Sequence, residues 1–203
     1  KAGRLQTADF PIHKFSTSLV QGEYNRANRD LELVQVSDIP GNNYLVSVGL
    51  TDDPMQDSLK FNGQKAYYGL DSMDIIVDSV REVRVADAII TPVDKQVIIG
   101  RDGYLKPLVD ATVEADQDDK LHKIYEATIQ VAGRNDYSGF GKYDYIEIDG
   151  QAQYIEFNDI KVNSQNTTVA SGEITEEDGF YLTERIFFRG NAFLDASSKF
   201  LDF

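Results

Sequence analysis

The sequence predicts an all-β protein in which stacked strand-turn-strand repeats form an open β-jellyroll or a β-solenoid-like stack. Short segments rich in Val, Ile, Tyr, Phe and Thr are separated by clusters of Gly, Asp, Asn and Ser, and a helical period is nearly absent. A polar residue followed by alanine opens several of these segments. Hydrophobic residues make up 41% of the 203 residues, which is typical of a globular chain and not of a disordered one.

Residues 1–60 form a less regular lead-in to this pattern. Pro-Gly-Asn-Asn in segment 39–43 and Asp-Asp-Pro at 52–54 predict turns. Between and before these turns, strands are expected at 13–20, 31–36 and 44–48.

Residues 61–203 read as repeat-like strands, and segment 73–86 is the one stretch that also fits a helix. Ile76, Val80 and Val83 lie three or four residues apart in it. Because β-branched residues favour strands and Ser79 is poorly suited to a helix interior, we predict a strand here.

The alternation is clearest near the middle of the second half. Ile155 and Phe157 alternate with polar residues over segment 153–160, and segment 145–148 alternates in the same way. Between these two segments, the dipeptide Asp149-Gly150 predicts a tight hairpin turn.

The alanines that open strands suggest an internal repeat. Ala66, Ala88 and Ala111 lie 22 and then 23 residues apart, and a polar turn follows each of them. We therefore expect these alanines to occupy equivalent buried positions on successive strand pairs. No linker divides the sequence, so residues 1–203 are expected to form a single domain.

Segment 59–85, which reads LKFNGQKAYYGLDSMDIIVDSVREVRV, resembles the repeat of OstA-like lipopolysaccharide-transport proteins. In that family an A-x-Y strand turns into an I-x-A-x-x-V strand, and the copies stack into an open β-jellyroll that carries lipid along its apolar interior. The remainder, with VADAIITP and FFRGNAFLDASSKFLDF, is similar to segments of large envelope proteins of Gram-negative bacteria. The resemblance implies export to the periplasm, the outer membrane or the cell surface.

Charge and composition exclude several classes of function. A formal net charge of −14 disfavours binding to nucleic acid and to anionic lipid headgroups. With no cysteine, the chain has neither disulfides nor thiol chemistry. No apolar run is long enough to span a membrane. The chain begins at Lys1, and the apolar alternation of Phe200–Phe203 stops abruptly, so we expect a piece of a longer parent chain whose remainder is its partner.

The sequence predicts no catalytic residue, no metal site and no cofactor. His13 and His122 lie far apart and lack spaced metal-ligating neighbours. No nucleophile elbow and no phosphate-binding loop occur. Two acidic clusters, at 116–119 and 176–178, fit solvated turns better than calcium loops, whose spacing they lack.

The best candidate for ligand binding is segment 135–145, expected to be a glycine-rich loop. It places Tyr137, Phe140, Tyr143 and Tyr145 among glycines. Aromatic faces with polar edges can stack on sugar rings, and glycines let a ligand approach the backbone. The alternative is a long hairpin connection whose tyrosines pack against the rim of the sheet.

Three functions follow from these observations. The first is a non-catalytic structural or binding module of a large bacterial cell-envelope protein. The second is carriage of lipid or lipopolysaccharide, which the OstA-like resemblance implies. The third is binding or processing of carbohydrate through aromatic residues. An open apolar trough would favour the second function, a flat tyrosine platform the third, and a closed, well-packed interior the first.

Overall fold

The computed structural model describes residues 7–34, 43–49, 51, 57–116, 119, 121–146, 150 and 152–203. These residues form strands and no helix, which confirms the predicted all-β class. The strands in the first half are β1 (Ala8–Phe10), β2 (Phe15–Thr17), β3 (Gln21–Asn25), β4 (Asp30–Val34), β5 (Tyr44–Ser47), β6 (Lys60–Asn62), β7 (Lys65–Gly69), β8 (Ile75–Asp78), β9 (Val83–Val85), β10 (Ala88–Thr91) and β11 (Gln96–Ile99). Those in the second half are β12 (Leu108–Ala115), β13 (His122–Gly133), β14 (Asp136–Ile146), β15 (Ala152–Val162), β16 (Thr168–Ile174), β17 (Tyr181–Thr183), β18 (Ile186–Phe187) and β19 (Gly190–Asp195).

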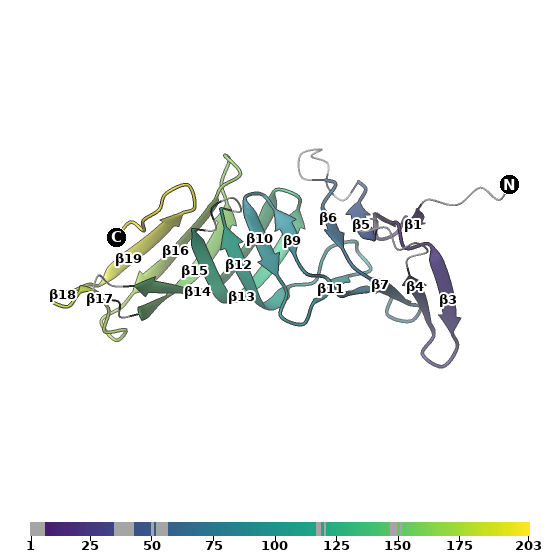
Figure 1. Ribbon diagram of the computed structural model, residues 1–203, viewed down its shortest axis with the longest axis horizontal. Helices are drawn as coiled ribbons and strands as arrows, with labels where there is room; N and C mark the ends of the chain where they lie inside the picture. Colours follow the sequence, from purple (N-terminus) through teal and green to yellow (C-terminus); the bar gives the residue numbers. More distant parts are fainter. Residues whose placement is uncertain are drawn as a thin grey trace.

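Two sheets account for nearly all of these strands. The larger has 12 strands in the order β1-β2-β5-β6-β9-β10-β12-β13-β14-β15-β16-β19, and the smaller has five in the order β11-β8-β7-β4-β3. The hairpin β17-β18 stands apart. The molecule is elongated, with β1 and β3 near one end and β17 to β19 near the other (Figure 1). The architecture is that of an open, jellyroll-like β-sandwich, as the sequence predicts.

In the first half, the chain crosses between the two sheets through short corners. Corners at 63–64, 79–82 and 92–95 connect β6 to β7, β8 to β9 and β10 to β11. Neighbouring corners are hydrogen-bonded, because the Val80 amide donates to the Lys95 carbonyl at 2.8 Å. Ser79 and Lys95 both adopt left-handed backbone angles, with φ of 60° and 57°. The corners therefore lie in a line, which we call the crease.

In the second half, the crease continues through strands that bend without breaking. The strand β12 belongs to the larger sheet, where Thr112 pairs with Thr91 of β10. The chain just before β12 contacts the smaller sheet, because the Lys106 amide donates to the Ile98 carbonyl of β11 at 2.8 Å. Register shifts mark β-bulges in β12 and β13, and two of these bulges contain a left-handed residue, Asp110 with φ of 56° and Glu126 with φ of 46°. A bulge bends a strand and increases its twist, so these bulges bend the chain at the crease, as the corners do in the first half.

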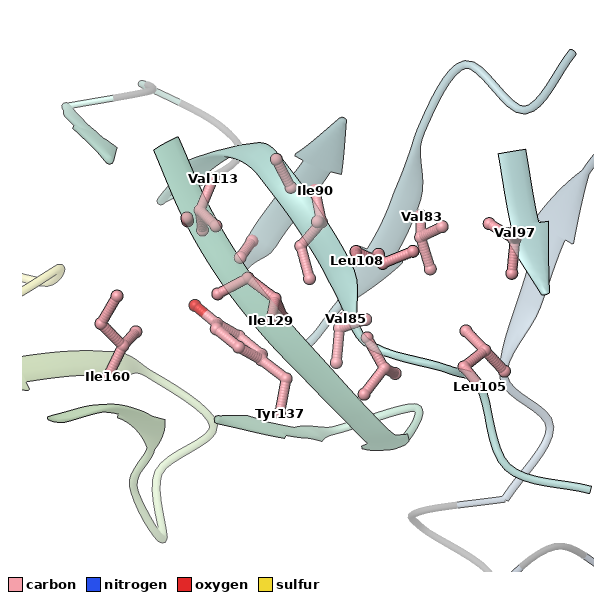
Figure 2. Close-up of a cluster of buried hydrophobic side chains, with 14 of the residues drawn as sticks. Val83, Val85, Ile90, Val97, Leu105, Leu108, Val113, Ile129, Tyr137 and Ile160 are labelled. Carbon is pink, nitrogen blue, oxygen red and sulfur yellow. The ribbon is translucent and has the colours of Figure 1, made fainter. Parts of the chain in front are cut away.

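The two sheets enclose one apolar core. Buried side chains from the five-stranded sheet, among them Leu33 and Val77, belong to the same cluster as those from the twelve-stranded sheet. Figure 2 shows the middle of this cluster, where Val97 of β11 and Val113 and Ile129 of the larger sheet project into a common interior. Because the strands present alternate residues to this interior, the period-2 pattern of the sequence is explained.

The alanine repeat is corrected by the topology. Ala66, Ala88 and Ala111 are all fully buried, as expected. However, Ala66 lies on β7 of the five-stranded sheet, whereas Ala88 and Ala111 lie on β10 and β12 of the larger one. The expected equivalence is wrong, because the chain changes sheet between the first two alanines.

The other expected elements are found with different bounds. Segment 73–86 is strand and not helix, but it contains both β8 and β9, which the corner at Ser79 assigns to different sheets. The strands β14 and β15 form the expected hairpin, with Ile146 opposite Ala152. In its connection, Gly150 has φ of 89°, while Asp149 lies outside the described residues. The turn expected at 52–54 and most of the one at 39–43 also lie outside them.

Candidate functional site

Segment 135–145, the predicted binding loop, is almost entirely strand. The chain turns at Arg134 and Asn135, and β14 is then an inner strand of the larger sheet, paired with β13 on one side and β15 on the other (Figure 1). The prediction of a loop is wrong, and so is the alternative of a long connection at the rim. Both interpretations assumed that the glycines indicate a loop. In the structure, glycine is required there because β14 passes very close to the neighbouring strand β13.

The close approach is seen at Gly139 and Gly141. A Cβ on Gly139 would lie 2.2 Å from the carbonyl oxygen of Thr128, and one on Gly141 would lie 2.8 Å from the Cβ of Ala127. Both contacts are with β13 at its bulge. Glycine is therefore needed where β14 passes the bend of its neighbour.

The four aromatic residues of this strand do not form one surface. Tyr137 is fully buried, and Tyr143 and Tyr145 are partly buried against the core. Phe140 lies on the opposite face and is 54% exposed. The structure thus separates Phe140 from the three tyrosines and provides no flat aromatic platform from this set.

Tyr137 instead takes part in a hydrogen-bonded network that closes the interior. The Asp87 carboxylate accepts from the Thr168 amide at 3.0 Å and from its hydroxyl at 2.6 Å. Since the Thr168 hydroxyl donates to Asp87, the Tyr137 hydroxyl donates to Thr168 Oγ1, also at 2.6 Å. Burial raises the pKa of Tyr137, so its hydroxyl keeps its proton for this bond. The hydroxyl oxygen of Tyr137 is visible in Figure 2.

The network joins opposite margins of the folded sheet. The turn between β9 and β10 lies at one margin, since Ala88 pairs with Ala115 at the end of β12. Arg134 lies in the turn at the far end of β13, yet its carbonyl accepts from the Ala86 amide at 2.9 Å. We call the contacts between the two margins the seam.

Both histidines of the chain form seam contacts of the same kind. His122 Nε2 lies 2.6 Å from the Ser198 carbonyl oxygen, and His13 Nε2 lies 2.6 Å from the Met73 carbonyl oxygen. A carbonyl oxygen only accepts, so Nε2 is the donor in each case. Each ring also packs against a tyrosine, His13 against Tyr68 and His122 against Tyr143. The sequence analysis assigned no role to either histidine.

Tyr143 and Tyr145 complete the closure at the C-terminal end. The Tyr143 hydroxyl lies 3.1 Å from Nδ1 of His122, and burial raises the pKa of Tyr143. The Tyr145 hydroxyl donates to the Leu182 carbonyl at 3.2 Å, and its ring contacts Phe180 and Phe203. Three of the four predicted residues therefore hold the structure together from inside.

These contacts hold both histidines inside the protein. His13 and His122 are 2% and 1% exposed, so a substrate could not reach either ring. No group of three or more potential metal-ligating side chains occurs in this part of the chain. In the acidic cluster 176–178, the Asp178 carboxylate binds the amide and hydroxyl of Thr175 in its own turn, as expected of a solvated turn. The described residues include no helix that could cross a membrane.

A second feature is an open hollow beside the loop that leads from β11 to β12. It has a volume of about 670 Å³. The polar and aromatic side chains that line it include Asp74, Arg101, Asp102, Tyr104, Lys106 and Gln130. This hollow was not predicted from the sequence, although Asp102-Gly103 followed by Tyr104 carries the same turn signal as Asp149-Gly150.

Comparison of the chain with models of protein families, with curated proteins and with solved structures finds no match.

Proposed function

We propose that the chain is a non-catalytic structural or binding module of a large bacterial cell-envelope protein, located in the periplasm, the outer membrane or the cell surface. The observation that carries this proposal is the filled, sealed interior between the sheets. The core side chains from both sheets form one cluster, and most of its members are fully inaccessible to solvent. Among the described residues, an interior packed in this way holds a shape and leaves no room for a cargo.

The buried polar groups support the same function. Within the described residues, every buried side-chain nitrogen or oxygen has a hydrogen-bond partner. Catalytic sites commonly leave polar groups available for substrate, whereas Asp87, Thr168 and Tyr137 use theirs on one another. A satisfied internal network rigidifies a fold and favours one arrangement of it.

The jellyroll-like topology favours carriage of lipid as the second candidate. A lipid chain would have to enter between the sheets, which requires breaking seam contacts such as Asp87 to Thr168 and displacing core side chains such as Val113 and Ile129. Both steps oppose lipid entry, so this function ranks behind the structural one.

The edge of the larger sheet supports a partner that continues it. The strand β19 pairs with β16 on one side, and on the other side Phe193 exchanges two backbone hydrogen bonds with Asp202, at 2.8 and 2.9 Å. Phe193 and Phe203 remain 49% and 41% exposed. Edge strands of this kind are normally covered, and the parent chain beyond Phe203 is the partner that we propose.

Two assays test the proposal. The purified chain is titrated with N-phenylnaphthylamine, a dye that fluoresces in apolar sites, and is incubated with panels of ester and glycoside substrates. We expect neither a saturable rise in fluorescence nor turnover. A saturable rise that lipopolysaccharide competes away would establish lipid carriage instead, and turnover of any substrate would establish an enzyme.

A further inference from the structure

The loop between β11 and β12 is held rigidly in place. The Gly100 amide donates to the Tyr104 carbonyl, and the Gly103 amide donates to the Gly100 carbonyl, both at 2.8 Å. Gly103 has φ of 87°, and a Cβ there would lie 2.6 Å from the carbonyl oxygen of His13, so the loop is pressed against the turn between β1 and β2. From the other side, Gln130 Nε2 donates to the Leu105 carbonyl at 2.7 Å. Because the loop is already fixed in this way, it loses little conformational entropy when a ligand binds.

The rigid loop presents an aromatic ring beside unused polar groups. Tyr104 is 44% exposed and is not part of the hydrophobic core. Arg101 forms no ion pair or hydrogen bond with any residue in the described part of the chain. One oxygen of Asp102 accepts from the Tyr104 amide at 3.1 Å, which fixes the carboxylate at the rim of the hollow. The Tyr104 ring can pack against an apolar face of a ligand, while the Arg101 guanidinium donates hydrogen bonds and the Asp102 carboxylate accepts them. This combination suits a ligand with both apolar faces and hydroxyl groups.

The charge around the hollow is balanced, in contrast with the net charge of −14 of the chain. Its lining contains two carboxylates, Asp74 and Asp102, and two cations, Arg101 and Lys106. Lys106 and Asp74 are already paired, with Nζ and Oδ2 2.6 Å apart. A balanced site offers no net attraction to an ion, so it favours an uncharged ligand.

We infer that this hollow is a binding site for a neutral saccharide, with Tyr104 stacking on a sugar ring while Arg101 and Asp102 bind its hydroxyl groups. A volume of about 670 Å³ lies within the range of small-molecule sites and has room for more than one sugar unit. The site lies outside the sealed interior, so it stands whether or not the structural role proposed above is correct.

The test uses the isotope-labelled chain and a panel of maltohexaose, cellohexaose, mannohexaose and N-acetylchitohexaose. We expect at least one of these to shift the amide resonances of Gly100, Gly103 and Tyr104 saturably. The acidic hexagalacturonate and inorganic phosphate form the comparison arm. If no neutral oligosaccharide shifts these amides, or if only the anions do, the inference is wrong.

Variants then locate the site. Tyr104→Ala should weaken binding about tenfold or more, equivalent to about 1.4 kcal/mol, and Arg101→Ala should weaken it severalfold. Tyr24→Ala is the matched control, because Tyr24 is 50% exposed on β3 and does not line the hollow. Arg101 lies outside the core, so its variant remains informative even if Tyr104→Ala fails to fold. Equal weakening by Tyr24→Ala, or unchanged binding by Tyr104→Ala and Arg101→Ala, would contradict the inference.

Discussion

The strands before Gly100 and the strands after Lys106 cross the same crease by different means. In the first region, each crossing is a break, and the chain continues in a separate sheet after a corner such as 79–82. In the second region, β12 and β13 continue through β-bulges, so each long strand pairs on both sides of the bend. The difference shows that one bend can be built either from turn residues or from an extra residue within a strand.

Each solution has its own cost. A corner interrupts the ladder, and the loss is partly offset by hydrogen bonds between neighbouring corners, such as that of the Val80 amide to the Lys95 carbonyl at 2.8 Å. A bulge keeps the ladder, but like the corners at Ser79 and Lys95 it places a residue other than glycine in the left-handed region, as at Glu126. There the Glu126 carboxylate is paired with Lys142 at 2.7 Å, and this hydrogen bond raises the pKa of Lys142.

The largest effect should come from filling the space at a bulge. Gly139→Ala would place a methyl group 2.2 Å from a backbone oxygen of Thr128, which cannot move without disturbing β13. We expect it to destabilise the chain by about 3 kcal/mol, measured by urea denaturation. The control is Gly22→Ala on β3, where the nearest atoms are methyl groups of Leu31 and Leu33 at 3.2 and 3.3 Å. These side chains can adjust, so the control should cost less than about 1 kcal/mol, and equal losses would contradict the role given to Gly139.

The seam should be the next most sensitive feature. Asp87→Ala removes a carboxylate that accepts from the amide and the hydroxyl of Thr168, which is itself fully buried. We expect a loss of about 2 kcal/mol, because two buried donors lose their acceptor. The matched control is Asp94→Ala, since within the described residues the Asp94 carboxylate accepts one hydrogen bond, from the exposed Gln96 amide at 3.0 Å. An equally small shift of the denaturation midpoint for both variants would show that the seam contact of Asp87 does not stabilise the fold.

The two histidine contacts allow a comparison between the regions. Replacement by phenylalanine keeps a ring but removes the donor to the opposite margin. His122→Phe also leaves the Tyr143 hydroxyl without its partner, so we expect a loss of about 2 kcal/mol. We expect about 1 kcal/mol for His13→Phe, because the His13 side chain forms one hydrogen bond within the described residues, to the Met73 carbonyl. Thermal denaturation of both variants checks the order. A larger loss for His13→Phe would mean that packing, and not hydrogen bonding, dominates at the seam.

The smallest effect concerns the bulge of β13, where Tyr125 donates a hydrogen bond to Asp144 at 2.6 Å. This bond and partial burial raise the pKa of Tyr125 to about 12, from 10.0. Because the folded state favours the protonated tyrosine, its contribution is complete below pH 10 and is lost as the pH rises to about 12. The difference between the ultraviolet titrations of the native chain and Tyr125→Phe should be centred near pH 12. A centre near 10 would show that the hydrogen bond does not form in solution.

The period-2 alternation was enough to predict the all-β class, and the β-branched residues of segment 73–86 were enough to predict strand there. Neither signal could divide that segment between two sheets, because buried residues lie at every second position both before the corner at Ser79, at Ile75 and Val77, and after it, at Val83 and Val85. Bulges are equally hidden, since a bulge as at Asp110 differs from regular strand by one residue in the register with a distant partner.

The site predictions failed where a local signal had a long-range cause. Gly139 and Gly141 indicated a loop, but the reason for these glycines is the backbone of β13. His13 and His122 carried no motif because their partners, Met73 and Ser198, lie 60 and 76 residues away. Tyr104, by contrast, directly follows the dipeptide Asp102-Gly103, a turn signal from which an exposed loop could have been predicted here.

The central claim is that both sheets, corners and bulges alike, enclose one core and unfold as one unit. Native-state hydrogen exchange tests it most directly. We expect the slowest amides of β7 and β8 in the five-stranded sheet to open with the same free energy as those of β13 and β14, and to lose stability equally in Gly139→Ala. Two distinct opening free energies, with Gly139→Ala affecting only the strands after Lys106, would show that the two regions are independent domains and contradict the claim.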